Sequence, residues 1–560
     1  MVLTNGADVE EMMVDDTANV IDPVWDAAVA AGVFVGAMLL FALDWRYGFA
    51  GSVTFVGAER VLAGDLPYRD FWTMYAPGHF YLNAAVRSVV GSHVIGLTIA
   101  ASVAASACAS GVYLLVRNFC GSGLGGLFCS SLFVAAMYGT GFFRYLGSYP
   151  TGIFFALAAL SLIAMFYYSQ RTVYLFAAGI CVGFVLILKH DVGIYTGTAI
   201  AAGMLAYFMG VRTNTYGVGA RTLLRDLGIF AAGGVIIALP VYVYFLAAAG
   251  EDMVRDLVVF PLTDFPYSRP EVYPSLVPRG IRGSTASRTL VNFLNYLSFA
   301  LPFLAAVSGV AAAAIAFIRR RPPEFALTVT FMAAFLFHYR AAHVQINTHI
   351  ISLSVYGGLI AVIGWKLFRE ESAIAERKLV SSAVAAAAVV WIASLAVPAA
   401  FTVRKKWAEA DAVLTIPKVS GTRLPAEEAA EFESIWPIVQ AEVPPGQPIY
   451  IGLNRHDTML IGDTMSYFIF DRPSATRYQE LHPAITDTAA AQAEMIRDIE
   501  SKKVRLLVLR RVFDDESLDQ FKRDFLVNLP NIGATDLDEY IRANFEKVHE
   551  FGSRSIWVRK

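Results

Sequence analysis

The sequence predicts a polytopic α-helical membrane protein of about eleven transmembrane helices, with an extracytoplasmic α/β domain at its C-terminal end. Composition is the first reason: 56% of the 560 residues are hydrophobic and only 16% are charged, against about 25% charged in soluble proteins. The second reason is a shift at Arg404-Lys405-Lys406, where long apolar runs give way to mixed sequence. The net charge of −2 offers no basic surface to a nucleic acid, which excludes that class of partner.

Each predicted span is a run of mainly apolar residues, of which about 20 are needed to cross a bilayer. The helix expected over 78–91 is too short and too mixed to span, so we expect it in the membrane interface. Residues 1–24 are acidic and carry no Lys or Arg, unlike a secretory signal peptide, and are predicted to form a disordered cytoplasmic tail. The predicted spans are 25–43, 94–116, 121–138, 150–168, 172–188, 192–210, 227–249, 291–318, 324–338, 349–368 and 380–401.

Basic residues in the short loops predict the orientation, because such loops are richer in Lys and Arg on the cytoplasmic side. With the N-terminus in the cytoplasm, the short outer loops hold only Arg144, Lys189 and Arg340. The inner loops hold many more, including the run 319–321. We therefore expect a multi-pass protein of the cytoplasmic (inner) membrane, with residues 25–403 as its membrane module.

Two long loops, 44–93 and 250–290, fall on the same outer side as the C-terminal domain, residues 404–560. Long loops on a rigid scaffold often carry binding and catalytic residues. Within the domain, helical and apolar strand patterns alternate, which predicts a small α/β fold. Strands are expected within 444–452, over 504–510 and within 541–560, and a helix over 487–502.

The stretch GDLPYRDFWTMYAPGHFY (64–81) places charges among aromatic residues just outside the first span. Asp70 is a candidate general base, because apolar neighbours raise a carboxylate's pKa and Arg69 lowers it. The structural alternative is that Asp70 caps a turn while Arg69 meets lipid headgroups. Tyr68, Arg69 and His79 are candidate substrate-binding residues of the same stretch.

Asp44, in LDWRYGF where the first span leaves the membrane, is the second candidate catalytic residue. Its alternative role is an interface anchor, since Trp45 and Tyr47 beside it suit an aromatic belt.

Lys189 and Asp191, in LKHDVG between two predicted spans, are candidate substrate-binding residues, because charges at such depth usually face a cavity, and Lys189 could hold a phosphate. The alternative is that Lys189 extends to the interface while Asp191 caps the next helix. Arg144, the basic residue of FFRYLGSYP, is a further candidate phosphate contact.

The stretch FHYRAAHVQINTHI contributes Arg340, His343 and His349 as a possible polar wall for phosphate or sugar hydroxyls, or as histidines satisfied at a helix start. The two histidines are six residues apart, whereas zinc-binding helices place them four apart. No metal site and no cofactor are indicated, and a need for Mg²⁺ or Mn²⁺ is left open.

Three stretches carry a resemblance to a known family: AERVLAGDLPYRDFWTMYAPGHFYL (58–82), VVFPLTDFPYSRP (258–270) and RPSATRYQELHP (472–483). With the many spans, they resemble the polytopic type C (GT-C) glycosyltransferases. These include bacterial relatives of protein mannosyltransferases and the lipid A aminoarabinose transferase. The resemblance implies a polyprenyl-phosphate sugar donor and an acidic residue of the first outer loop acting as base or orienting the acceptor.

Asp70 is the nearest match to that acidic residue. Many relatives carry an acidic pair upstream, where this sequence reads GFAGS (48–52) and the nearest acid is Asp44. The base therefore stays open between Asp70 and Asp44.

The predicted function is transfer of a sugar, with inversion, from a polyprenyl-phosphate donor to a glycan, lipid or protein acceptor of the cell envelope. A hexosyl or pentosyl group would move at the outer face of the membrane, among membrane lipids. The alternatives are a transporter or flippase of a lipid-linked intermediate and a non-catalytic envelope scaffold.

Overall fold

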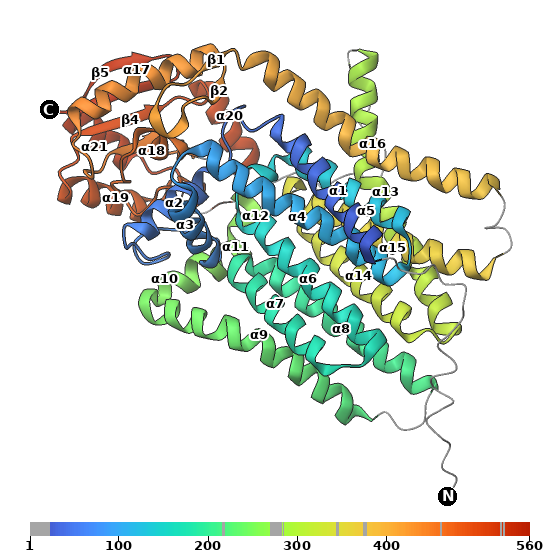
Figure 1. Ribbon diagram of the computed structural model, residues 1–560. Helices are drawn as coiled ribbons and strands as arrows, with labels where there is room; N and C mark the ends of the chain where they lie inside the picture. Colours follow the sequence, from blue (N-terminus) through green and yellow to red (C-terminus); the bar gives the residue numbers. More distant parts are fainter. Residues whose placement is uncertain are drawn as a thin grey trace, which may run out of the picture.

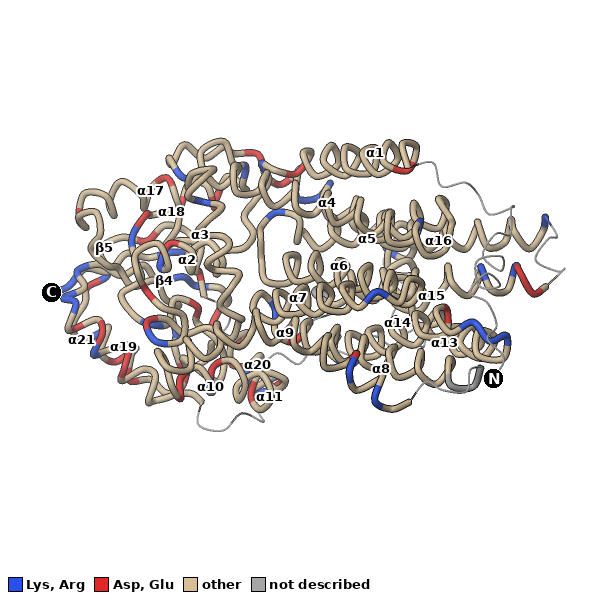
Figure 2. The backbone as a smooth tube through the Cα atoms, turned by 60° about the horizontal axis from the view of Figure 1, so that its bottom comes forward, with Lys and Arg blue, Asp and Glu red and all other residues tan. Residues whose placement is uncertain are grey.

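The structure is a computed structural model that describes residues 23–214, 219–268, 283, 285–342, 346–372, 378–459, 462–526, 529 and 532–560. A bundle of long helices forms one end of the molecule, and a sheet-containing C-terminal domain forms the other (Figure 1). Charged residues are dense in the C-terminal domain and sparse along the bundle (Figure 2). Apart from residues 23 and 24, which begin the first helix, the predicted acidic tail lies outside the described residues.

Every one of the eleven predicted spans corresponds to a helix. Among the described residues, nine helices are long and apolar enough to cross a membrane, so the polytopic fold class is confirmed and the count of eleven stays a prediction. The two others are α7, an apolar helix of 17 residues, and α14. The helices are α1 (Pro23–Ala42), α4 (Val94–Cys120), α5 (Gly123–Thr140), α6 (Ser148–Ser169), α7 (Thr172–Leu188), α8 (His190–Asn214), α9 (Ala220–Ala249), α13 (Ala286–Ile318), α14 (Pro322–Ala341), α15 (Ile346–Glu371) and α16 (Lys378–Glu409).

Helices α7 and α9 cross closely because glycines line both sides of the crossing. A Cβ on Gly179 would lie 2.0 Å from the carbonyl oxygen of Phe230, and one on Gly183 would lie 2.8 Å from that of Gly234. Gly179 and Gly183 have the G-x-x-x-G spacing that lets two membrane helices approach backbone to backbone. The crossing holds α7 in the bundle with its C-terminal end next to the site described below.

Replacing Gly179 with alanine is expected to lower the melting temperature of the detergent-solubilised protein, because the new methyl group forces the two helices apart. Overpacking of this kind costs about 1–3 kcal/mol. The matched control is Gly228→Ala on α9, where an added Cβ meets nothing within 4 Å. Equal melting temperatures for the two variants would contradict the close crossing.

The two long loops predicted to lie outside the membrane, named the first (44–93) and second (250–290) outer loop by that prediction, contain short helices. The first holds α2 (Ser52–Leu62) and α3 (Gly78–Val90), the latter matching the helix predicted over 78–91. The described part of the second holds α10 (Glu251–Val254), a π-helical turn η3 (Arg255–Val259), α11 (Phe260–Thr263) and α12 (Phe265–Ser268). A 3-10 turn, η2 (Phe142–Arg144), follows α5.

The C-terminal domain is built on a four-stranded sheet in the order β3-β4-β6-β5. β3 and β4 are parallel, and β6 is antiparallel to both of its neighbours. The predicted strands and the helix over 487–502 are found, and α16 runs past residue 403 to Glu409. The elements are β1 (Ala412–Val413), η4 (Pro417–Val419), β2 (Arg423–Leu424), α17 (Ala426–Glu442), β3 (Tyr450–Leu453), α18 (Met465–Phe470), α19 (Ala489–Ser501), β4 (Leu506–Arg510), α20 (Asp515–Phe525), α21 (Asp536–Asn544), β5 (Phe545–Phe551) and β6 (Arg554–Arg559).

Candidate active site

Lys189 lies between the end of α7 and the start of α8, with its side chain only 10% exposed. Its Nζ is 3.2 Å from Oδ1 of Asp191 and 5.9 Å from the centre of the Tyr75 ring. Asp191, in the first turn of α8, also accepts the backbone N–H of Val192 at 2.9 Å. A lysine held this way between two helices and the first outer loop can present its charge to an anion.

Two histidines lie beside this pair. Nδ1 of His338 on α14 is 2.9 Å from Nδ1 of His349 on α15, and both rings are buried. The ring of Tyr149 stands edge-on to both histidines, and its hydroxyl is 2.6 Å from Oγ of Ser352. Asp191 interacts electrostatically with both histidines. We call Lys189, Asp191, His338, His349, Tyr149 and Tyr75 the Lys189 cluster.

The other residues predicted in that stretch lie close by or outside the described residues. Arg340 is two residues beyond His338 on α14 and interacts electrostatically with Tyr195, whose ring packs edge-on against His338. His343 lies outside the described residues. Among the residues that the structure describes, no three His, Cys, Asp or Glu side chains are grouped as metal ligands would be.

The first outer loop docks on α7 next to Lys189. A Cβ on Gly78 would lie 2.6 Å from the carbonyl oxygen of Ile187, so only glycine allows this approach. His79 follows, 1% exposed, with Nδ1 2.8 Å from the carbonyl oxygen of Ala76. Burial, with a smaller effect from Lys189, lowers the pKa of His79 to about 3, so its ring is neutral at physiological pH.

Asp70 lies in the same loop with its carboxylate 29% exposed. It accepts the backbone N–H of Leu66 at 2.7 Å and hydrogen bonds from Arg69 at 2.7 and 3.0 Å. The hydrogen bond from Arg69, which is itself half exposed, contributes most to lowering the pKa of Asp70. The carboxylate is therefore ionised at neutral pH, as a base must be, and it also caps the turn.

Tyr68 is fully buried and has a φ of 69°, a left-handed conformation that is uncommon for a bulky residue. Its ring packs against Phe245, and its hydroxyl donates to the carbonyl oxygen of Tyr75 at 2.7 Å. Tyr68 thus connects the Asp70 turn with the Lys189 cluster.

Asp44 and Arg144, predicted from separate segments, lie together. Asp44 is 2% exposed, forms an ion pair with Lys406, accepts from Nε1 of Trp407 at 2.9 Å and lies 3.8 Å from Nε of Arg144. Arg144 also donates to the carbonyl oxygen of Gly48 at 2.7 Å. Lys406 lines a cavity of about 220 Å³ at the junction of α16 and the C-terminal domain.

Sequence reasoning missed several members of these groups. Lys406 and Trp407 stand at the end of α16, more than 360 positions from Asp44. The basic run Arg404-Lys405-Lys406 marks a domain boundary in the sequence, but it does not indicate that Asp44 is the partner of Lys406. Tyr149 lies in the first turn of α6, five residues after Arg144, and the aromatic content of FFRYLGSYP gave no sign of its histidine neighbours.

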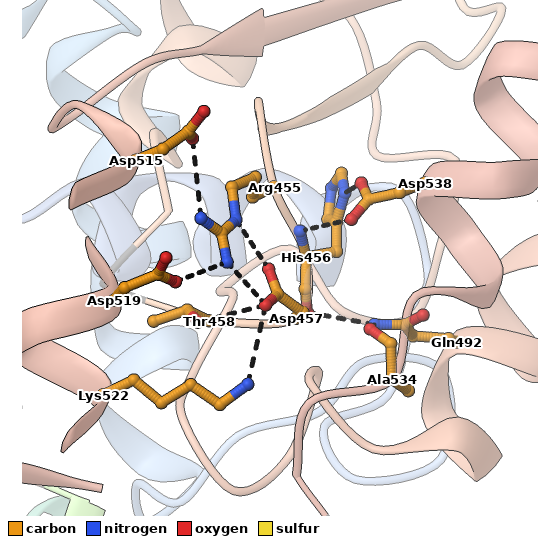
Figure 3. Close-up of polar contacts among 10 residues, drawn as sticks. All are labelled: Arg455, His456, Asp457, Thr458, Gln492, Asp515, Asp519, Lys522, Ala534 and Asp538. Carbon is orange, nitrogen blue, oxygen red and sulfur yellow. Dashed lines mark hydrogen bonds and ion pairs between the residues drawn. The ribbon is translucent and has the colours of Figure 1, made fainter.

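A further polar cluster, shown in Figure 3, follows β3 in the C-terminal domain. Arg455 pairs with Asp457 at 2.7 Å and with Asp519 of α20 at 2.8 Å, while Nδ1 of His456 is 2.6 Å from Asp538 of α21. The carboxyl edge of parallel strands is a common ligand site in α/β proteins. Here the charged groups bind one another, so the cluster ties β3 to α20 and α21.

Asp487, near this cluster, predicts a pH dependence of stability. Its side chain is fully buried, and burial raises its pKa to about 7, so the folded state keeps a proton that the unfolded chain has released above about pH 4. Stability should therefore fall as the pH rises from about 4 through about 7, and level off at higher pH, where both states are ionised. We expect the melting temperature to drop between pH 5 and pH 8 in the wild type, and less in Asp487→Asn. Parallel curves for the two proteins would contradict this assignment.

No family model and no curated protein match the chain. Solved structures do match, among them ArnT from Cupriavidus metallidurans bound to undecaprenyl phosphate and the same protein in the apo state. The first has a TM-score of 0.51 and 13% identity, and the second a TM-score of 0.50 and 12% identity. Both alignments cover 95% of this chain and 97% of the other.

The chain has the ArnT fold. ArnT is the lipid A aminoarabinose transferase, a GT-C enzyme, so the resemblance found in the sequence is confirmed at the level of the fold. The alignment covers both the bundle and the C-terminal domain, so the ArnT fold extends over nearly the whole chain.

Proposed function

We propose that the protein is a membrane glycosyltransferase that moves a hexosyl or pentosyl group from a polyprenyl-phosphate donor to an envelope glycan, lipid or protein. The observation that carries the proposal is the Lys189 cluster, a buried cation between the bundle and the first outer loop, in a chain with the ArnT fold along its length. The neighbour of that fold was solved with undecaprenyl phosphate bound, which supports this donor class.

In the proposed reaction, the polyprenyl tail stays in lipid and the donor phosphate binds Lys189. Asp70 takes the proton of an acceptor hydroxyl as its oxygen bonds to the anomeric carbon, with inversion. The bond from that carbon to the phosphate oxygen breaks, and polyprenyl phosphate leaves. A positioned cation stabilises the negative charge that grows on the leaving group.

The two candidate carboxylates differ in accessibility, which supports Asp70 as the base. Asp70 is partly exposed and paired with an arginine that is itself half exposed, whereas Asp44 is 2% exposed among three partners. An acceptor can reach Asp70 by displacing Arg69, but it would have to break the buried Asp44 group.

The test is release of polyprenyl phosphate from a panel of labelled polyprenyl-phosphate sugars by the purified protein, with cell-envelope extract as acceptor source. We expect release by the wild type and none by the double variant Asp44→Asn/Asp70→Asn. No release from any donor by a folded wild type would refute the transferase.

A scaffold is the second candidate, favoured by one observation: each candidate carboxylate already has cationic partners within the protein. If the protein is a scaffold, neither carboxylate has to be free to accept a proton. Release that is identical in the wild type and the double variant would exclude catalysis by either residue.

A further inference from the structure

One arginine of the C-terminal domain joins three segments that are distant in the sequence. Nη2 of Arg477 donates to the carbonyl oxygen of Tyr68 at 2.6 Å and lies 3.2 Å from a carboxylate oxygen of Asp256 in η3. Its Nη1 is 3.4 Å from Asp252 of α10. The Arg477 side chain is 11% exposed and that of Asp256 is fully buried. A guanidinium group suits this position because its planar fork serves several acceptors at once.

The backbone around Arg477 also forms hydrogen bonds with the first outer loop. The carbonyl oxygen of Arg477 accepts the N–H of Trp72 at 3.0 Å, and that of Thr476 accepts Nη1 of Arg60 at 3.2 Å. The Trp72 ring packs against His482 of the domain and Phe260 of the second loop. The first outer loop is therefore held between the second outer loop and the C-terminal domain.

The contact at Tyr68 is the one that reaches the candidate active site. Tyr68 keeps a left-handed backbone conformation, which costs free energy and persists only where surrounding contacts enforce it. Its carbonyl oxygen is held by Arg477, its hydroxyl donates to Tyr75, and the Tyr75 ring lies 5.9 Å from Nζ of Lys189. Two residues after Tyr68 stands Asp70, whose carbonyl oxygen is held by Arg60 at 2.7 Å.

We infer that Arg477 is a positioning residue: it fixes the first outer loop so that the turn at Asp70 keeps its shape and Tyr75 keeps its place in the Lys189 cluster. Its catalytic consequence rests on the proposed function, but its effect on the loop does not. The inference assigns the C-terminal domain the task of holding the first outer loop in shape.

The test compares Arg477→Ala with Arg472→Ala, a matched control in the same segment. Arg472 is 3% exposed, and its hydrogen bonds go to Val443, Asp471 and Gln440, all within the C-terminal domain. Hydrogen–deuterium exchange of peptides covering residues 64–76 measures how readily the loop opens, whether or not turnover is seen. Turnover is followed as polyprenyl phosphate release with a fixed donor.

We expect exchange over 64–76 to be about tenfold faster in Arg477→Ala, as loss of a buried hydrogen bond predicts, and unchanged in Arg472→Ala. The kcat of Arg477→Ala should fall about 10-fold to 100-fold, the usual effect of a small misplacement, with the donor KM within about twofold. Arg477→Lys should lose less kcat than Arg477→Ala but not keep the wild-type value, because an ammonium group lacks the guanidinium fork.

Unchanged exchange over 64–76 in folded Arg477→Ala would overturn the inference, and so would an unchanged kcat. Equal effects in Arg472→Ala would also overturn it, because they would mean general loosening of the domain. If the wild type releases no polyprenyl phosphate, the proposed function fails, and faster exchange confined to Arg477→Ala still supports the positioning of the loop.

Discussion

Replacing Asp70 with asparagine is expected to lower the release of polyprenyl phosphate about 10²-fold to 10⁴-fold, the usual contribution of a positioned general base. The amide keeps the shape of the carboxylate and can still accept the N–H of Leu66, but it cannot take a proton. Because the side chain is partly exposed, the melting temperature should change little. Initial rates at saturating donor measure the effect.

The matched control for Asp70→Asn is Asp65→Asn, in the same loop, where the carboxylate pairs with Arg60 at 2.7 Å. It should keep nearly full turnover. Asp44→Asn tests the competing assignment: it leaves Lys406 and Arg144 without their buried partner, so it should lower the melting temperature. Full activity in Asp70→Asn with loss in Asp44→Asn at a temperature where both are folded would move the base to Asp44.

Replacing Lys189 with methionine is the second large expected effect. Removal of a single preorganised group that stabilises developing negative charge costs about 10²-fold to 10³-fold in turnover, and donor affinity should fall as well. Methionine fills the space of the aliphatic stem, so the junction of α7 and α8 keeps its packing. Turnover and binding of polyprenyl phosphate to the purified protein measure the two effects.

Lys366→Met is the control for Lys189→Met. Lys366 lies 3.5 Å from Glu324, at the opposite end of α14 and α15 from His338 and His349. Its removal should affect stability modestly and leave turnover unchanged. If Lys189 serves only as an interface anchor, Lys189→Met should behave like this control and bind polyprenyl phosphate normally.

The helical fold could be predicted because each span carries its own signal, a run of apolar residues long enough to cross a bilayer. The eleven predicted segments all correspond to helices, including α7 and α14. The strands at β3 and β4 were also found, since both are short apolar runs between turns. The ends of helices were harder to predict: α16 continues to Glu409, and Lys406 and Trp407 in its last turns bind Asp44, a partner that the local sequence does not indicate.

The candidate site could be predicted only in parts. Lys189, Asp191 and His349 stood out as charges or rings at the ends of apolar runs, and the structure brings them together. Their grouping depends on how helices pack, which no local pattern records. The contact from Arg477 to Tyr68 joins residues 409 positions apart, and neither residue's neighbours in the sequence point to the other.

Only two residues separate the end of α16 from the first strand of the C-terminal domain. The last helix of the bundle thus continues directly into that domain, and its Lys406 and Trp407 bind Asp44, just beyond the end of α1. For anyone exchanging parts between related proteins, a joint at the composition shift near residue 404 would therefore cut through a continuous helix. Any joint between Asp44 and Lys406 separates that carboxylate from its partners, so in evolution as in engineering, the segment around Asp44 and the end of α16 should change together.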